Sequence, residues 1–234
     1  SALPPINQVA HLDPDGRAAV DGFVGRGREM DELRRILQES LSGQARLVML
    51  VGEPGIGKTR TSQELAGHAE EWGAQVHWGR CYDGEGAPPY WPWVQLLRSF
   101  LQQADADQLA AQMGPGAADI GEILPEVRER LPELGPPPAL EPEQARFRLF
   151  DSIGRYLDNL ARTRPLMLVL DDLHWADRPS LMLLEFVVQE LGRAPVLLVG
   201  TYRDIEVSRG NPLSETWATS AATRLPPPGA GGPQ

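Results

Sequence analysis

Cysteine and lysine each occur only once in this 234-residue sequence, as Cys81 and Lys58. A single cysteine cannot form an intramolecular disulfide and gives no support to a cysteine-based zinc site, which is typical of a reducing, intracellular setting. Long hydrophobic runs are also lacking: LVMLV and PVLLV have the length of a strand, far short of the roughly 18 residues of a membrane helix. The N-terminal residues do not have the basic-then-apolar layout of a signal peptide. We therefore expect a cytoplasmic protein that does not interact with a membrane.

Positive charge is scarce relative to negative charge, with 22 basic against 32 acidic side chains and a formal net charge of −10. Phosphate backbones reward clustered lysine and arginine, so we expect no direct binding of nucleic acid by this chain. Apolar residues make up 41% of the sequence, which is enough for an ordinary core. The length suits one large domain, or one domain with an appended piece.

Shifts in composition divide the chain into three parts. Residues 1–21 are punctuated by proline and aspartate without periodicity, and we expect an N-terminal arm or linker there. Residues 22–210 carry the periodic and apolar segments of a domain. Residues 211–234 have neither period nor core residues, which is typical of a disordered tail.

Strands and helices alternate within the domain. Helical spacing predicts helices over residues 28–41, 58–71, 93–103, 144–162 and 180–191, and apolar runs predict strands over 46–51, 74–78, 166–170 and 195–200. Strands that are apolar throughout and alternate with helices indicate an α/β fold, with a parallel sheet covered on both faces.

The least regular part of the domain is residues 84–142, which we expect to form a helical insertion between strands 2 and 3. A loop rich in glycine, proline and aromatic residues opens it. Two interpretations of its aromatic residues remain open, a surface for a protein partner or, as we favour, packing over the edge of the sheet; they are Tyr90, Trp91 and Trp93.

The segment GEPGIGKT, from Gly52 to Thr59, matches G-x-x-x-x-G-K-[ST] at every fixed position. An apolar strand directly before it and a helix directly after it supply the context that this motif requires. Its glycines allow backbone N–H groups to wrap a polyphosphate, and the following helix directs its positive end at the same phosphates. The segment therefore predicts a site for ATP or ADP. The residues expected to bind the nucleotide here are Gly52, Glu53, Pro54, Gly55, Ile56, Gly57, Lys58, Thr59 and Arg60.

Lys58 is the one basic residue of the chain that is not an arginine. Its ammonium group is a compact point charge that can reach the β- and γ-phosphates, whereas a planar guanidinium cannot occupy the same narrow space. The hydroxyl of Thr59 is expected to bind Mg²⁺. The single lysine thus occupies a position where the shape of the cationic group matters as well as its charge.

Two aspartates follow the apolar strand in PLMLVLDD. Ligands of open parallel sheets bind at the carboxyl ends of the strands, so both side chains should emerge beside the phosphate-binding loop. We expect Asp171 to hold Mg²⁺ through its water shell and Asp172 to orient or deprotonate the attacking water. The competing interpretation is a solvated turn after a buried strand.

A third motif, VLLVGTYRD, ends in Thr201 and Arg203. A hydroxyl and a guanidinium at the end of this strand would lie near the γ-phosphate, where arginine stabilises developing charge. The expected catalytic residues are therefore Asp172, Lys58 and Arg203. A surface arginine just beyond a strand is the alternative for Arg203.

Taken together, these motifs resemble a STAND-class P-loop ATPase, a branch of the AAA-like ATPases. More narrowly, they resemble the ATPase domain of large LuxR-type and adenylate-cyclase-linked bacterial regulators. The resemblance spans about residues 22–210 and rests on FVGRGREMDEL, GEPGIGKTR, GRCYDGEGAPPYWPW, LVLDDLHWAD and GTYRD, in this order. It implies a three-layer α/β/α sandwich with sheet order 5-1-4-3-2.

The resemblance also implies roles for individual residues. Arg203 would read the γ-phosphate, and His174 with Trp175 would couple the Mg²⁺ site to neighbouring elements. The residues expected against the adenine and ribose are Val24, Gly25 and Arg26.

The sequence departs from the pattern of this family in three ways. Gly27 stands where an acidic residue is usual, so the role of that carboxylate is lost or moves to Glu29. After GTYRD the sequence runs into a Pro/Gly-rich segment, where the family continues with a fifth strand, a helical lid and a winged helix. We therefore expect a shortened protein or a piece of a longer one. No helix-turn-helix segment is found, so DNA binding is not assigned to this chain.

The favoured function is a Mg²⁺-dependent ATP/ADP-binding switch with slow hydrolysis, in a signalling or transcriptional regulator. Protein partners, or self-association through this domain, are expected. The alternative is a module that binds nucleotide, is catalytically inert and serves protein interaction. A small-molecule kinase shares the phosphate-binding loop, but it would need an acceptor pocket and a mobile basic lid that the arginines here do not form.

Overall fold

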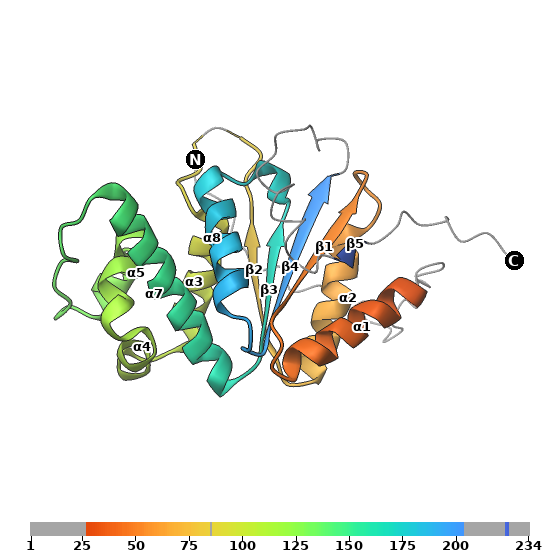
Figure 1. The fold of residues 1–234 in the computed structure, drawn as a ribbon, viewed down its shortest axis with the longest axis horizontal. Helices are drawn as coiled ribbons and strands as arrows, with labels where there is room; N and C mark the ends of the chain where they lie inside the picture. Colours follow the sequence, from red (N-terminus) through yellow and green to blue (C-terminus); the bar gives the residue numbers. More distant parts are fainter. Residues whose placement is uncertain (1–26, 85, 204–222, 225–234) are drawn as a thin grey trace, which may run out of the picture.

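The computed structural model describes residues 27–84, 86–203 and 223–224 (Figure 1). In chain order the elements are α1 (Gly27–Leu41), β1 (Arg46–Gly52), α2 (Lys58–Glu71), β2 (Gln75–Arg80), α3 (Trp91–Gln103), α4 (Ala106–Met113), η1 (Gly114–Gly116), α5 (Ala117–Ile123), α6 (Glu126–Arg130), α7 (Pro142–Thr163), β3 (Leu166–Asp171), η2 (Leu173–Trp175), α8 (Arg178–Glu190), β4 (Val196–Arg203) and β5 (Thr223–Arg224).

One parallel sheet forms the centre of the molecule, with strand order β2-β3-β4-β1-β5. Every adjacent pair of strands is parallel. The order is the one that the resemblance implies, and the predicted α/β fold is confirmed. Because all strands run the same way, their carboxyl ends, and the loops that follow them, meet at one edge of the sheet.

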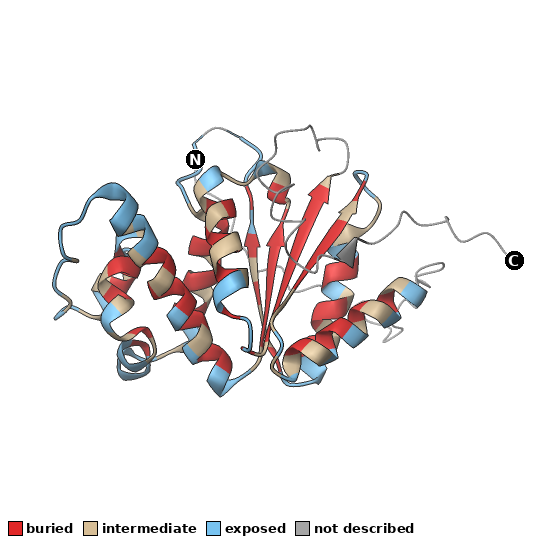
Figure 2. Ribbon diagram, viewed as in Figure 1, coloured by how far each residue is buried: buried red, intermediate tan, exposed pale blue. Residues whose placement is uncertain are grey.

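Helices cover both faces of the sheet, which makes three layers (Figures 1 and 2). Successive strand residues point to opposite faces, so each strand contributes to two cores. Val48 and Leu50 belong to the core shared with α1 and α2. Leu47 and Met49 belong to the larger core that contains α3, α7, α8 and the insertion helices. A strand buried on both faces must be apolar throughout, which is the pattern seen in the sequence.

The elements differ from the predicted bounds chiefly at their ends. The predicted strand over residues 195–200 extends to Arg203, and the predicted strand over 74–78 lies at Gln75–Arg80. Both strands extend past their apolar residues, because the backbone pairs with the neighbouring strand whatever the polarity of the side chains. The helix predicted from residue 93 begins at Trp91, two residues earlier. The proline at residue 92 is tolerated in the first helical turn, because the backbone N–H groups of that turn have no partner within the helix.

The insertion between β2 and β3 is helical, as predicted, and packs beside α7 (Figure 1). The side chain of Trp93 is 1% exposed, and its indole Nε1 donates to the carbonyl oxygen of Ser180 in α8 at 3.0 Å. This aromatic residue therefore packs over the sheet and does not form a partner surface.

The two residues of β5 correct one expectation. The composition of residues 211–234 predicted a disordered tail without a fifth strand, yet Thr223 and Arg224 pair in parallel with Val48 and Met49 of β1. The other residues from 204 to 234 lie outside the described part of the chain. A sheet edge offers backbone donors and acceptors to any extended segment, so no apolar pattern was needed in the sequence.

His77 of β2 gives the fold a pH dependence. Its side chain is buried and stacks near Phe100, with ring centroids 3.8 Å apart, and Nδ1 lies 2.6 Å from the hydroxyl of Ser99. Among the described residues, no partner reaches its Nε2 atom. Burial disfavours the imidazolium and lowers the pKa of His77 to about 4.

We expect the free energy of unfolding to fall as the pH drops from about 6.5 towards 4. In this range His77 binds a proton in the unfolded chain but remains neutral in the folded chain. The loss attributable to this residue should reach at most about 1.4 kcal/mol per pH unit. Urea unfolding at several pH values in this window would measure it. The His77→Gln variant, which cannot titrate, should have a shallower slope, and equal slopes in the two proteins would contradict the assignment.

Candidate functional site

The loop between β1 and α2 is formed by glycines in conformations that other residues rarely adopt. Gly55 has φ 78° and Gly57 has φ 92°, in the left-handed region. Gly57 directly precedes α2, and it offers no side chain to cap the first turn. The N-terminal end of α2 is thereby open to an anion, which its N–H groups and its dipole both favour.

Lys58 is the first residue of α2, and its side chain folds back over this loop. The ammonium Nζ donates to the carbonyl oxygen of Gly52 at 2.9 Å and to that of Glu53 at 3.0 Å. The cation is therefore held above the end of β1, at the loop that the sequence motif predicted to bind phosphate.

Thr59 and Asp171 are brought together although 112 residues separate them in the chain. The hydroxyl of Thr59 lies 3.4 Å from each carboxylate oxygen of Asp171, which is the last residue of β3 and is buried. A hydroxyl and a carboxylate are hard oxygen ligands, the donor chemistry that suits Mg²⁺. Within the described ranges, no three or more histidine, cysteine or carboxylate side chains gather around a common point.

Thr201 of β4 organises the two aspartates. Its hydroxyl donates to Asp171 Oδ1 at 2.6 Å and accepts the backbone N–H of Asp172 at 2.8 Å. The side chain is fully buried. The sequence predicted this hydroxyl near a γ-phosphate; in the structure it is hydrogen-bonded to both aspartates.

Asp172 adopts a left-handed backbone conformation, with φ 59° and ψ 44°. Its Oδ2 accepts from Nε of Arg80 at 3.3 Å and from Nη2 at 3.1 Å. The carboxylate that was predicted to act on water is therefore paired with a guanidinium.

Sequence reasoning missed Arg80. It is the last residue of β2 and pairs in register with Asp171, so it ends at the same edge of the sheet as the aspartates. The available signal was an arginine that closes the strand before the insertion, in the segment GRCYDGEG. That signal is weak, because strand-ending arginines are common on protein surfaces.

The remaining predicted residues are placed as follows. Arg203 ends β4 and lies opposite Gly52 in the register of β1 and β4, beside the start of the phosphate-binding loop. His174 lies in η2, with its ring centroid 5.2 Å from that of Trp175 and 5.9 Å from that of Tyr202. The predicted adenine and ribose contacts lie outside the described residues; they are Val24, Gly25 and Arg26.

The single cysteine is buried close to the aspartates of the site. Cys81 follows β2 directly and is buried. Burial, with the nearby carboxylates of Asp177, Asp172 and Asp171, raises the pKa of its thiol to about 12. The thiol is therefore protonated at neutral pH.

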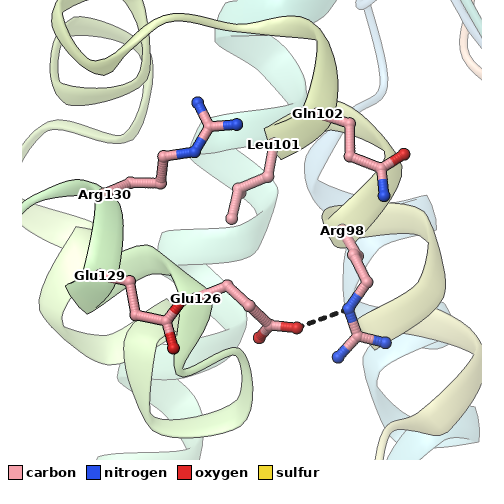
Figure 3. A pocket seen from close by; sticks show the side chains of 6 residues that line it. All are labelled: Arg98, Leu101, Gln102, Glu126, Glu129 and Arg130. Carbon is pink, nitrogen blue, oxygen red and sulfur yellow. Dashed lines mark hydrogen bonds and ion pairs between the residues drawn. The ribbon is translucent and has the colours of Figure 1, made fainter.

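A second concave feature lies in the insertion, between α3 and α6 (Figure 3). It has a volume of about 290 Å³ and contains an ion pair between Arg98 Nε and Glu126 Oε1 at 2.6 Å. Its lining residues are Arg98, Leu101, Gln102, Glu126, Glu129 and Arg130. None of them belongs to the phosphate-binding loop or to the strand ends, so this cavity is separate from the site described above.

The parallel sheet, the loop after β1 and the aspartates after β3 together define an α/β fold of the P-loop NTPase type. The family model described as AAA ATPase domain matches residues 22–199, and the chain belongs to this family. No helix of the described residues is long and apolar enough to cross a membrane.

Individual relatives are distant. The chain is 25% identical over 194 residues to an uncharacterized protein, R02095, of Rhizobium meliloti (strain 1021); the match covers 77% of this chain and 18% of that protein. The chain thus spans less than a fifth of the length of that curated relative. Among solved structures, Cdc6p from Pyrobaculum aerophilum is 16% identical with a TM-score of 0.53, over 91% of this chain and 47% of that one. This likeness concerns the fold alone.

Proposed function

We propose that this chain is a regulatory switch domain that binds ATP or ADP with Mg²⁺ and hydrolyses ATP slowly. The observation that carries the proposal is the approach of Thr59 to Asp171 beside the lysine-bearing loop, within a fold and family of nucleotide-binding ATPases. The motifs that resemble STAND-class domains of LuxR-type regulators support a role in signalling or transcriptional regulation.

Nucleotide binding would use the loop from Gly52 to Arg60. The β- and γ-phosphates would exchange with the two carbonyl oxygens that Lys58 contacts, because a phosphate oxygen carries more negative charge than a carbonyl and attracts the ammonium more strongly. Backbone N–H groups at the start of α2 would bind the same phosphates. Contacts of Val24, Gly25 and Arg26 with the base and ribose are part of the proposal.

Hydrolysis would depend on positioning and electrostatics rather than on covalent chemistry. The metal, held by Thr59 and Asp171, would neutralise charge on the phosphates. Asp172 would accept a proton from the attacking water or orient it, and Arg203 would stabilise charge on the γ-phosphate. Slow turnover fits the pairing of Asp172 with Arg80, since an oxygen that accepts two guanidinium donors is a poor acceptor for water.

The same ion pair favours a second candidate function. If Asp172 stays paired with Arg80 after ATP binds, the chain is an inert nucleotide-binding module that serves protein interaction. Protein partners or self-association are proposed under both functions, and direct nucleic-acid binding is proposed under neither. Phosphate release that requires Mg²⁺ separates the two, because the inert module binds ATP without cleaving it.

The dependence of ATP affinity on Mg²⁺ tests the metal site. We expect the chain to bind a fluorescent ATP analogue more tightly with Mg²⁺ than without it, and Thr59→Val to lose at least about tenfold, ~1.4 kcal/mol, of the affinity measured with Mg²⁺. Thr59 is exposed, so this substitution leaves the core intact. Thr59→Ser keeps the hydroxyl and is the matched control. If the valine variant responds to Mg²⁺ as the parent does, Thr59 does not hold the metal.

A further inference from the structure

The strand that carries Arg80 is an edge strand. β2 has β3 on one side only, because it stands first in the order of the sheet. The N–H of Gln75 donates to Pro165 and that of Cys81 to Asp171, so these residues face β3. In a parallel ladder alternate residues face opposite edges, which leaves the backbone groups of Arg80 facing outward.

Gln95 of α3 occupies that outer edge. Its side-chain Nε2 donates to the carbonyl oxygen of Arg80 at 2.8 Å, and its Oε1 accepts the N–H of Arg80 at 3.3 Å. One amide side chain thus pairs with both backbone groups of a single residue, as a neighbouring strand would. The last residue of β2 is thereby fixed by the helical insertion.

Gly79 allows α3 to come this close. A Cβ atom built on Gly79 would lie 2.1 Å from the carbonyl oxygen of Pro92 in the first turn of α3. No other residue type fits this contact, so the helix packs directly on the backbone of β2. The approach and the pairing of Gln95 are two separate observations that place α3 against Arg80.

The side chain of Arg80 connects the contact between α3 and β2 with Asp172. It is 71% exposed and forms an ion pair with Asp172 at 3.1 Å, and its Nε atom lies 4.0 Å from Asp171 Oδ2. Both of its hydrogen bonds to Asp172 end on the same carboxylate oxygen, Oδ2. A long, exposed side chain keeps one geometry only if its backbone is held, which is what Gln95 does.

We propose that Gln95 and Arg80 are positioning residues that restrain Asp172, so that the helical insertion acts as a brake on ATP hydrolysis. This inference rests on the proposed function. Gln95 holds the backbone of Arg80, and Arg80 occupies Oδ2, one of the two oxygens of Asp172 that would otherwise accept a proton from water. Any displacement of α3 from β2 loosens the ion pair and frees the carboxylate, so α3 is the element through which turnover is regulated.

The test uses Arg80→Met and Gln95→Met, which keep side-chain length and remove the polar groups. Two quantities are measured for each protein: the affinity for a fluorescent ATP analogue with Mg²⁺, and the rate of ATP cleavage in a single turnover with protein in excess. We expect Arg80→Met to cleave ATP about two- to fivefold faster, the range that an exposed ion pair supports, with unchanged affinity. Gln95→Met should give an increase no larger than this.

Non-additivity distinguishes positioning from a general structural effect. Because Gln95 acts through Arg80, the double variant should cleave ATP no faster than Arg80→Met alone. The matched control is Arg98→Met, one helical turn further along α3, which breaks the ion pair with Glu126 (Figure 3) without touching Arg80 and should leave the rate unchanged.

Each of the following rates would overturn the inference: a rate in Arg80→Met equal to or below that of the parent, an additive effect of Gln95→Met in the double variant, or an equal gain in Arg98→Met. The absence of cleavage in all proteins, with binding of the ATP analogue preserved, also overturns it and leaves nucleotide binding intact. If the parent does not bind the analogue, the proposed function fails first, and the inference fails with it.

Discussion

Replacing Lys58 with alanine is expected to abolish nucleotide binding, with a loss of affinity of at least about a hundredfold, ~2.7 kcal/mol. The ammonium is held directly over the phosphate-binding loop by the carbonyl oxygens of Gly52 and Glu53. Hydrogen bonds to charged groups are stronger than neutral ones, and removing the cation leaves phosphate charge without this partner. Isothermal titration calorimetry with ATP and with ADP measures the effect directly.

Lys58→Arg is the informative companion to this variant. It keeps the charge but replaces a compact ammonium with a planar fork, so we expect it to bind ATP nearly as poorly as the alanine variant. Both variants should unfold at temperatures close to that of the parent, because Lys58 is only half-buried and belongs to neither apolar core. Unchanged ATP affinity in Lys58→Ala would refute the assignment of this loop, and full affinity in Lys58→Arg would refute the argument from shape.

The second large effect is expected at Asp172. Asp172→Asn should bind ATP as the parent does and lose hydrolysis by about 10²- to 10⁴-fold, the usual contribution of a general acid or base. An amide cannot accept a proton from water, whereas it has nearly the same size as the carboxylate. Asparagine also tolerates the left-handed conformation of this residue, φ 59°, so the turn after β3 is preserved.

Phosphate release at saturating ATP and Mg²⁺, measured beside ATP affinity, checks this prediction. Asp83→Asn is a control, because it removes an exposed carboxylate in the segment after β2 for which no role in catalysis or binding is proposed. Release at the parental rate in Asp172→Asn would remove this residue from its catalytic role. A simultaneous loss of ATP affinity would show instead that Asp172 contributes to binding.

Most of the architecture was predictable because it depends on local patterns. Four apolar runs of strand length, alternating with amphipathic helices, specify a parallel sheet with both faces covered. The helix from Lys58 to Glu71 was predicted with its observed bounds, since the glycine-rich turn that precedes it marks the residue at which the helix begins. The strand β5 was not predicted, because a two-residue segment that pairs only through its backbone has no pattern to detect.

Parts of the candidate site could also be predicted from local sequence patterns. The phosphate-binding loop is a contiguous motif, and the position of Asp171 at a strand end follows from the rule that parallel strands finish at one edge. In the structure the hydroxyl of Thr59 lies 3.4 Å from each carboxylate oxygen of Asp171. The roles of these residues in binding and catalysis stay predictions until they are measured.

The sequence by itself determined the α/β class, the loop that suits phosphate and the strand that delivers two aspartates, because each is set by residues close together in the chain. Only the tertiary structure decided what those aspartates contact. Thr201 lies beneath them and Arg80 pairs with Asp172, across separations of 29 and 92 residues. Such contacts depend on strand order and register, and these are fixed by the packing of the whole sheet, which no short segment of sequence encodes.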